Sequence, residues 1–450
     1  MRTHRNSRPS VIAAAGAAVL LALGAQPARA IPSFARQTKL PCSACHTQFP
    51  ELNAFGRVFK LNGYTLRMIE TIESADTLGH QDLSINLMPL PSVMVQASET
   101  YTARPQPGTT NGNVMLPDQL SVFLAGAITP KIGAFIQVTY DPQAGTIGLD
   151  NTSIRYATPV TLASKTGVFG LSLNNNPTVQ DIFNSTPAWG FPFASSAVAP
   201  APAAATLVDG TLAQQVAGLS AYLFWNDAVY AEFGGYRWAP QGAPALPDAS
   251  VAGVVEGVAP YWRLALTRSF GDNFLEIGTY GMYALRQPGS FTSGNATDRY
   301  TDIAFDAEFQ RSMGSNNLTI AGTWIHESRS LGASVDSGFA SVASQQVNTF
   351  RARATYMVGQ AYAFTLGTFL TSGTADATLY GPAPVVGSRT GGPNSSGAIA
   401  EVDWNPWMNA RFSLQYTLYS KFNGASSNYD GAGRNASDNN TLYALMWLMF

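Results

Sequence analysis

Apolar and polar side chains alternate along most of this chain, and that period of two constrains the fold more than any other feature. Segments 301–311, 348–356 and 408–419 each carry apolar residues at every second position and polar residues between them. Successive side chains of a strand point to opposite sides, so the pattern predicts strands with one apolar and one polar face. We predict sixteen strands, near residues 84–97, 117–128, 131–141, 147–157, 166–174, 214–225, 228–238, 257–269, 273–286, 300–313, 316–328, 345–358, 361–372, 396–405, 408–419 and 441–450.

The connections between these segments separate two all-β architectures. A soluble β-sandwich shows the same alternation, but here short links such as Asn226-Asp227 and Gly314-Ser315 alternate with long ones such as 175–213 and 373–395. Outer-membrane barrels have short periplasmic turns and longer extracellular loops. The links 142–146 and 158–165 fit that alternation least well. Pro89 and Pro91 cannot donate ladder hydrogen bonds, so residues 84–92 are alternatively part of the haem segment or a connector.

Composition favours a strand-built membrane protein. Charged residues make up only 12% of the chain, about half their usual share in soluble domains. The final strand is an apolar ladder ending in Phe450, which resembles the C-terminal strand of bacterial outer-membrane barrels. We therefore predict an all-β fold, a 16-stranded antiparallel transmembrane β-barrel surrounded by outer-membrane lipid. The net charge of −2 gives no basic face for nucleic acid.

The first thirty residues have the features of a secretory signal peptide. Three arginines precede the apolar stretch 11–23, and Ala28-Arg29-Ala30 supplies a cleavage site, so the mature chain should begin at Ile31. The alternative, a membrane anchor, is disfavoured because the apolar stretch is too short for a spanning helix.

The pentapeptide Cys42-Ser43-Ala44-Cys45-His46 contains both cysteines of the chain. C-x-x-C-H is the attachment pattern for c-type haem, in which the two thiols form thioethers and the histidine ligates the iron. A disulfide is the alternative for an exported protein, but it would not require His46. We predict one covalent haem c on Cys42 and Cys45, with His46 as the proximal ligand.

The haem segment is too small to form a large core by itself. Only about fifty residues separate Ile31 from the first strand, and small domains are marginal without help. We expect a signal peptide at 1–30, a partly helical monohaem cytochrome c module at 31–82 and a porin-like outer-membrane barrel at 83–450. We expect the module to plug the lumen or to cap its periplasmic mouth.

Residues 33–64, from Ser33-Phe34-Ala35-Arg36 to Leu61-Asn62-Gly63-Tyr64, resemble the N-terminus of the fused monohaem cytochrome–porins of iron-oxidising bacteria. The segment from Asn175 to Asp181 is also similar to that family, as are Pro187, Trp189, Gly190 and Pro192 after it, whereas Lys39-Leu40-Pro41 departs from its pattern. The resemblance implies an iron(II)–cytochrome oxidoreductase that takes electrons from extracellular Fe(II) or a similar donor. It implies a periplasmic c-type cytochrome or copper protein as acceptor.

Other residues are weaker candidates for the haem site. Arg57 and Lys60 are candidates for the haem propionates, because charge-assisted pairs suit buried carboxylates. His80 or Met68 is predicted as the sixth iron ligand, and His326, Met88 and Met94 are further alternatives. Oxygen ligands that Fe(II) could visit are the acids of the loop and lumen, namely Asp181, Asp302, Asp306 and Glu308. Strand parity predicts that four arginines face the lumen, where they could bind acids of the plug: Arg263, Arg351, Arg353 and Arg411.

Three functions remain open from the sequence. The first is electron transfer across the outer membrane. The second is a transport porin whose haem module acts as a gate or redox sensor. The third is a barrel that anchors a periplasmic cytochrome. The position of the haem relative to the barrel discriminates among them.

Overall fold

The computed structural model describes residues 33–66, 71–73, 84–86, 91–240, 252–292 and 294–450. The expected signal peptide and the candidate ligands Met68, His80 and Met88 lie outside these residues. In the described part of the chain, no helix has the length and hydropathy needed to span a membrane.

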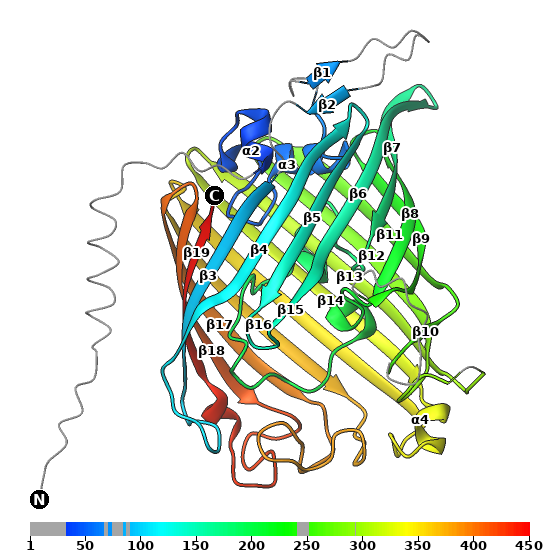
Figure 1. Ribbon diagram of the computed structural model, residues 1–450, viewed down its shortest axis with the longest axis vertical. Helices are drawn as coiled ribbons and strands as arrows, with labels where there is room; N and C mark the ends of the chain where they lie inside the picture. Colours follow the sequence, from blue (N-terminus) through cyan, green and yellow to red (C-terminus); the bar gives the residue numbers. More distant parts are fainter. Residues whose placement is uncertain (1–32, 67–70, 74–83, 87–90, 241–251, 293) are drawn as a thin grey trace, which may run out of the picture.

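A closed antiparallel barrel forms the body of the protein (Figure 1). Each wall strand pairs with the wall strands before and after it in the sequence, and the first pairs with the last. The two-residue strand β10 (Val255–Glu256) pairs with β12, and β9 pairs directly with β11. Sixteen strands of the described chain make up the wall. They are β3 (Pro91–Thr102), β4 (Asn113–Thr129), β5 (Ile132–Asp141), β6 (Thr146–Leu162), β7 (Lys165–Asn174), β8 (Val216–Trp225), β9 (Val229–Trp238), β11 (Ala259–Phe270), β12 (Asn273–Arg286), β13 (Asp298–Met313), β14 (Asn316–Ser330), β15 (Ser344–Val358), β16 (Tyr362–Gly373), β17 (Ser395–Trp407), β18 (Ala410–Lys421) and β19 (Thr441–Met449).

The alternation read from the sequence sorts the side chains between the two faces of this wall. Outward-facing apolar residues are exposed on the isolated chain, including Leu266, Ile277, Phe305, Leu366 and Leu414. Inward-facing residues on the same strands are polar and buried, including Glu276, Asp306 and Thr365. An apolar exterior and a polar interior are the arrangement expected for a barrel in lipid, so the predicted fold class is confirmed.

Several predicted strand bounds were wrong: β3 continues to Thr102, β4 begins at Asn113, and two further differences change the connections. The first barrel strand begins at Pro91 rather than at residue 84, because a proline can open a strand but cannot donate within its ladder. Strand β6 continues to Leu162, so its link to β7 is only Ala163-Ser164. Both link residues have positive φ, 50° and 60°, as a tight type I′ hairpin turn requires. Every connection at this end of the barrel is therefore short.

The N-terminal segment lies inside one end of the barrel. It contains α2 (Ser33–Thr38), the 3-10 turn η1 (Cys42–Ala44) and α3 (Ala54–Leu61), followed by the hairpin β1 (Thr71–Glu73) and β2 (Ser84–Asn86). Figure 1 shows α2 and α3 at the end that carries the C-terminus, opposite the long loops. We call residues 33–66 the plug. The predicted boundary at 82/83 falls between β1 and β2, which pair with each other.

The long segment between β7 and β8, which we call the inner loop (175–215), folds into the lumen rather than over the surface. It carries η2 (Pro187–Trp189) and η3 (Leu207–Thr211). Its residues Ile182 and Phe183 share a buried cluster with Leu61 of the plug and Tyr222 and Tyr230 of the wall. The remaining short helices, α4 (Gly332–Asp336) and η5 (Ala436–Asn439), lie in the long loops.

Candidate functional site

The Cys-x-x-Cys-His segment is held in a compact loop by the residues that follow it. The side chain of Asn53 caps α3 by accepting from the Gly56 N–H at 3.0 Å, and its amide donates to the Ala44 carbonyl at 3.0 Å. A Cβ on Gly56 would lie 2.1 Å from the Cys45 oxygen, so only glycine lets α3 approach the loop this closely. The motif and the helix therefore form one rigid unit.

The imidazole of His46 is oriented through its Nδ1 atom. Nδ1 lies 3.1 Å from the Pro50 carbonyl oxygen, an arrangement in which Nδ1–H donates and Nε2 keeps its lone pair. A backbone carbonyl on the second ring nitrogen is the usual support of a metal-ligating histidine. Burial lowers the pKa of His46 to about 4, with the Pro50 and Glu51 backbone acting in the opposite direction. The ring is thus neutral and available as a ligand at neutral pH.

The two thiols are not joined in a disulfide. Burial raises the pKa of Cys42, and burial together with the neighbouring Cys42 raises that of Cys45 to about 11. Both sulfurs are therefore protonated near neutral pH. They lie beside the same lumen cavity as His46.

That cavity has a volume of about 460 Å³, within the range of small-molecule and cofactor sites. Most of its lining is apolar and aromatic, contributed by the plug, the wall and the inner loop together: Phe34, Phe49, Phe59, Phe123, Phe135, Trp189, Phe193 and Trp447. A flat apolar macrocycle with two thioether attachments and one imidazole ligand matches this donor set and lining. The residues present therefore fit a c-type haem, and we call this space the haem cavity.

The two propionate candidates lie in different places. Lys60 lines the haem cavity, and its Nζ donates to the Val179 carbonyl at 2.8 Å and lies 4.1 Å from the centre of the Trp189 ring. Burial, and then the charge of Arg155, lowers the pKa of Lys60 well below its ordinary value. Arg57 does not line the cavity. Its guanidinium donates to Gln310 at 2.8 Å and lies over Phe274, so it fastens the plug to the wall.

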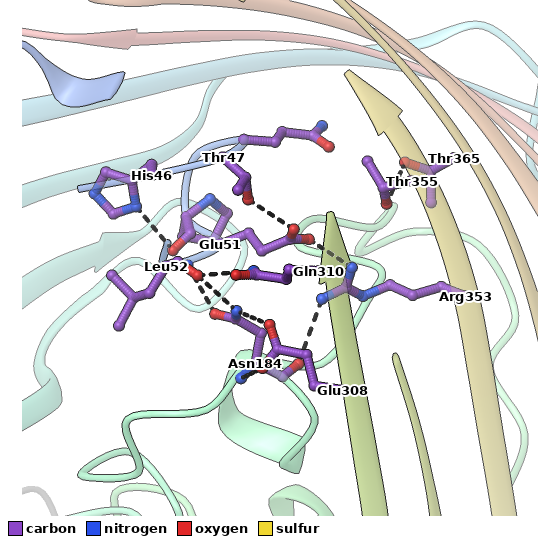
Figure 2. A network of polar contacts seen from close by, with 12 residues as sticks. His46, Thr47, Glu51, Leu52, Asn184, Glu308, Gln310, Arg353, Thr355 and Thr365 are labelled. Atoms are coloured by element: carbon purple, nitrogen blue, oxygen red, sulfur yellow. Dashed lines mark hydrogen bonds and ion pairs between the residues drawn. The ribbon is translucent and has the colours of Figure 1, made fainter. Parts of the chain in front are cut away.

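Two predicted lumen arginines bind the plug. Arg353 donates to Glu51 at 2.5 Å, and Arg411 donates to the Phe49 carbonyl at 2.8 Å. Figure 2 shows Glu51 between Thr47 and Arg353, with Leu52 beside Asn184 and Gln310. No pattern in the sequence points to Asn184, which exchanges two hydrogen bonds with the Leu52 backbone at 2.7 and 2.9 Å.

The other two predicted lumen arginines bind the inner loop. Arg263 contacts Asp181 at 2.9 Å together with Glu276 and Asp306 of the wall. Arg351 pairs with Asp209 at 2.6 Å. These contacts fix the inner loop in the lumen beside the plug.

The acids proposed as transient Fe(II) ligands are occupied by protein partners. Asp181 and Asp306 bind Arg263, Glu308 accepts from Asn184 at 2.6 Å, and Asp302 accepts from the Val208 N–H at 2.8 Å. Across the described residues, no three histidine, cysteine, aspartate or glutamate side chains converge as a metal-ion site. In this structure these carboxylates hold the inner loop in place.

A second lumen cavity of about 420 Å³ lies between the inner loop and the wall from β14 to β18. Its lining includes Arg351, Thr349 and Tyr419, which lie beyond the haem cavity toward the long loops. Pro187, Gly190 and Pro192 line both cavities. A single segment of the inner loop therefore separates them.

Comparison with known proteins finds solved outer-membrane barrels that resemble the chain at low sequence identity. No protein-family model matches it, and no curated protein matches it. The solved structures that resemble it include the outer membrane channel DcaP of Acinetobacter baumannii, at 10% identity and a TM-score of 0.47, covering 80% of this chain and 96% of that one. An anion-selective porin from Comamonas acidovorans matches at 11% identity and a TM-score of 0.47, covering 80% and 98%. The strand order and the buried contacts of Glu51 and Leu61 with the wall define the class: a closed 16-stranded β-barrel with part of its own N-terminal segment in the lumen.

Proposed function

We propose that this protein transfers electrons across the bacterial outer membrane, from an extracellular donor such as Fe(II) to a periplasmic cytochrome or copper protein, through one covalent haem c. The observation that carries the proposal is that Cys42, Cys45 and His46 all line one apolar cavity enclosed by the barrel. A haem bound there supplies one-electron exchange. The protein supplies its attachment, its orientation and its isolation from lipid.

The end of the barrel that holds the plug supports a periplasmic exit for the electrons. The haem cavity lies beside Pro91–Met94 and Trp447–Met449, at the end with short turns. In outer-membrane barrels the short turns face the periplasm. An acceptor protein at this mouth would meet the plug directly.

The second lumen cavity supports an entry route from the other end. It extends toward the long loops, which face outward in such barrels, and only the segment around Pro187, Gly190 and Pro192 separates it from the haem cavity. A small hydrated or chelated donor in this cavity would be separated from the haem by a single segment of polypeptide. The lipid around the barrel, whose apolar band is about 25 Å tall, would otherwise insulate the two sides.

The filled lumen argues against free permeation of solutes. Leu61 of the plug and Phe183 of the inner loop share one buried cluster with the wall, and Arg353 and Asn184 connect the same parts through polar contacts. A transport porin would have to displace both segments. We therefore retain electron transfer as the proposed function.

The decisive experiment uses the full-length holoprotein in sealed vesicles that contain trapped cytochrome c. Fe(II) added outside should reduce the trapped cytochrome, and the absorption spectrum should show a single covalent haem. His46→Ala should abolish this reduction. His326→Asn is the matched control, because His326 stacks against Trp324 on the outer face and bonds to Asn348, and it should leave the reduction unchanged.

Two results would contradict the proposal. One is a purified protein with no covalently bound haem. The other is a haem that Fe(II) reduces only when it is applied at the short-turn end of the barrel.

A further inference from the structure

The barrel wall brings two methionines to the haem cavity, where they face the plug. Met94 on β3 and Met449 on β19 are direct partners in the register that joins the first and last strands. Both line the haem cavity. Met94 is buried in a cluster with Leu445 and Trp447, against which Phe49 of the plug packs.

This cavity offers few atoms that could bind iron opposite His46. Within the described residues the other histidine is His326, whose ring lies on the outer face against Trp324. Lys60 also lines the cavity, but its amine is held by the Val179 carbonyl. The phenol-bearing Tyr64 stacks against Phe34 with 5.2 Å between ring centres. Asp150 lines the cavity as well, but its carboxylate accepts hydrogen bonds from Thr139 at 2.9 Å and Gln214 at 3.0 Å. The methionine sulfurs of Met94 and Met449 remain.

A second cavity distinguishes Met94 from Met449. A smaller cavity of about 280 Å³ at the mouth of the barrel is lined by Cys42, His46 and Met449, but not by Cys45 or Met94. The haem cavity is lined by both cysteines, His46 and Met94. Since a c-type haem needs both thiols, its iron belongs in the haem cavity, and Met449 divides its surface between that cavity and the one at the mouth, whereas Met94 lines the haem cavity and not the other. Met94 is also the more deeply buried of the two, with 3% of its surface exposed.

We propose that Met94 of the barrel wall supplies the sixth ligand to the haem iron, an inference that rests on the proposed function. The iron would then be bound by His46 of the plug and by Met94 on β3, where the first and last strands of the barrel pair. Methionine ligation raises the reduction potential of a haem relative to histidine ligation, which suits a weak donor such as Fe(II). The reduction potential of the haem would therefore also depend on docking of the plug in the barrel.

The test compares three conservative methionine variants of the full-length holoprotein. Met94→Leu preserves volume and removes the sulfur. Met449→Leu is the matched control in the same cavity, and Met446→Leu changes a residue of β19 on the opposite, outward face. Covalent haem content, the red charge-transfer band of methionine-ligated ferric haem and the midpoint potential are measured for each protein.

We expect Met94→Leu to keep its covalent haem, to lose the charge-transfer band and to titrate at a lower potential. Met446→Leu should retain the band and the wild-type potential, and Met449→Leu should retain the band. Met94→His is a second variant, which should restore a six-coordinate low-spin spectrum at a potential below that of the wild type.

The possible failures are distinguishable. A wild-type haem without the charge-transfer band, or a band that survives Met94→Leu, overturns the assignment of Met94 while leaving the haem in place. Loss of the band in Met449→Leu alone assigns the ligand to Met449 and likewise overturns it. A wild-type protein without covalent haem refutes the proposed function itself.

Discussion

Replacing Arg353 by methionine should loosen the plug without unfolding the barrel. Arg353 and Glu51 lie 2.5 Å apart, with side chains 4% and 0% exposed. Removing one member of such a buried ion pair costs about 3–5 kcal/mol, because the remaining charge is left without a partner. The barrel strands keep their own ladder of hydrogen bonds, so the cost falls on docking of the plug.

This free-energy cost predicts a measurable change in the hydrogen-exchange rate of the plug. Since about 1.4 kcal/mol corresponds to a factor of ten in an equilibrium constant, the population of the undocked plug should rise at least about 100-fold. Hydrogen exchange of the α3 amides, such as the Arg57 N–H bonded to the Asn53 carbonyl, should accelerate by the same factor. Exchange in β13 should not change.

Arg351→Met provides the matched control on the same strand and the same face. The Arg351 side chain is 41% exposed and pairs with Asp209 of the inner loop, so its removal should cost less than about 1 kcal/mol. The double variant Glu51→Gln/Arg353→Gln leaves no unpaired charge and should recover much of the lost protection. Unchanged exchange of α3 in Arg353→Met, or equal loss in the single and double variants, would refute the reasoning.

Two further predictions concern the motif loop and the long loops. Gly56→Ala should lower covalent haem content, because its Cβ would collide with the Cys45 carbonyl, whereas Gly332→Ala has no atom within 4 Å and should be neutral; equal haem content in both variants would count against the role of Gly56. Although burial alone would raise the pKa of Asp376, hydrogen bonds from the Leu379 and Ser341 N–H groups lower it to about 2. Because this pKa lies below the ordinary 3.8, the hydrogen bonds that Asp376 accepts from residues 341–342 should persist above about pH 4. They should be lost as the pH falls to about 2 and the carboxylate is protonated. Hydrogen exchange in that loop at stepped pH checks this, and Asp376→Asn should show the loosened state already at neutral pH.

The sequence by itself was sufficient to predict the barrel fold. Side chains of a strand alternate between its two faces, so the period of two identified the wall strands from β4 to β19 and the faces of Arg263, Arg353 and Arg411. The same parity could have placed Met449 on the inner face, since it lies next to the outward ladder that ends at Phe450. The lengths of the connections distinguished a membrane barrel from a sandwich for a similar local reason.

The tertiary structure decided what lies inside the barrel. Glu51 meets Arg353 across 302 residues of sequence, and Leu52 meets Asn184 across 132. No periodicity records such pairs, because they form only when the wall has closed and the plug and the inner loop compete for one enclosed volume. The Cys-x-x-Cys-His motif predicts its own chemistry from five adjacent residues. The cavity around it exists only in the folded chain, because it includes residues such as Met94, which lies where the first and last strands pair.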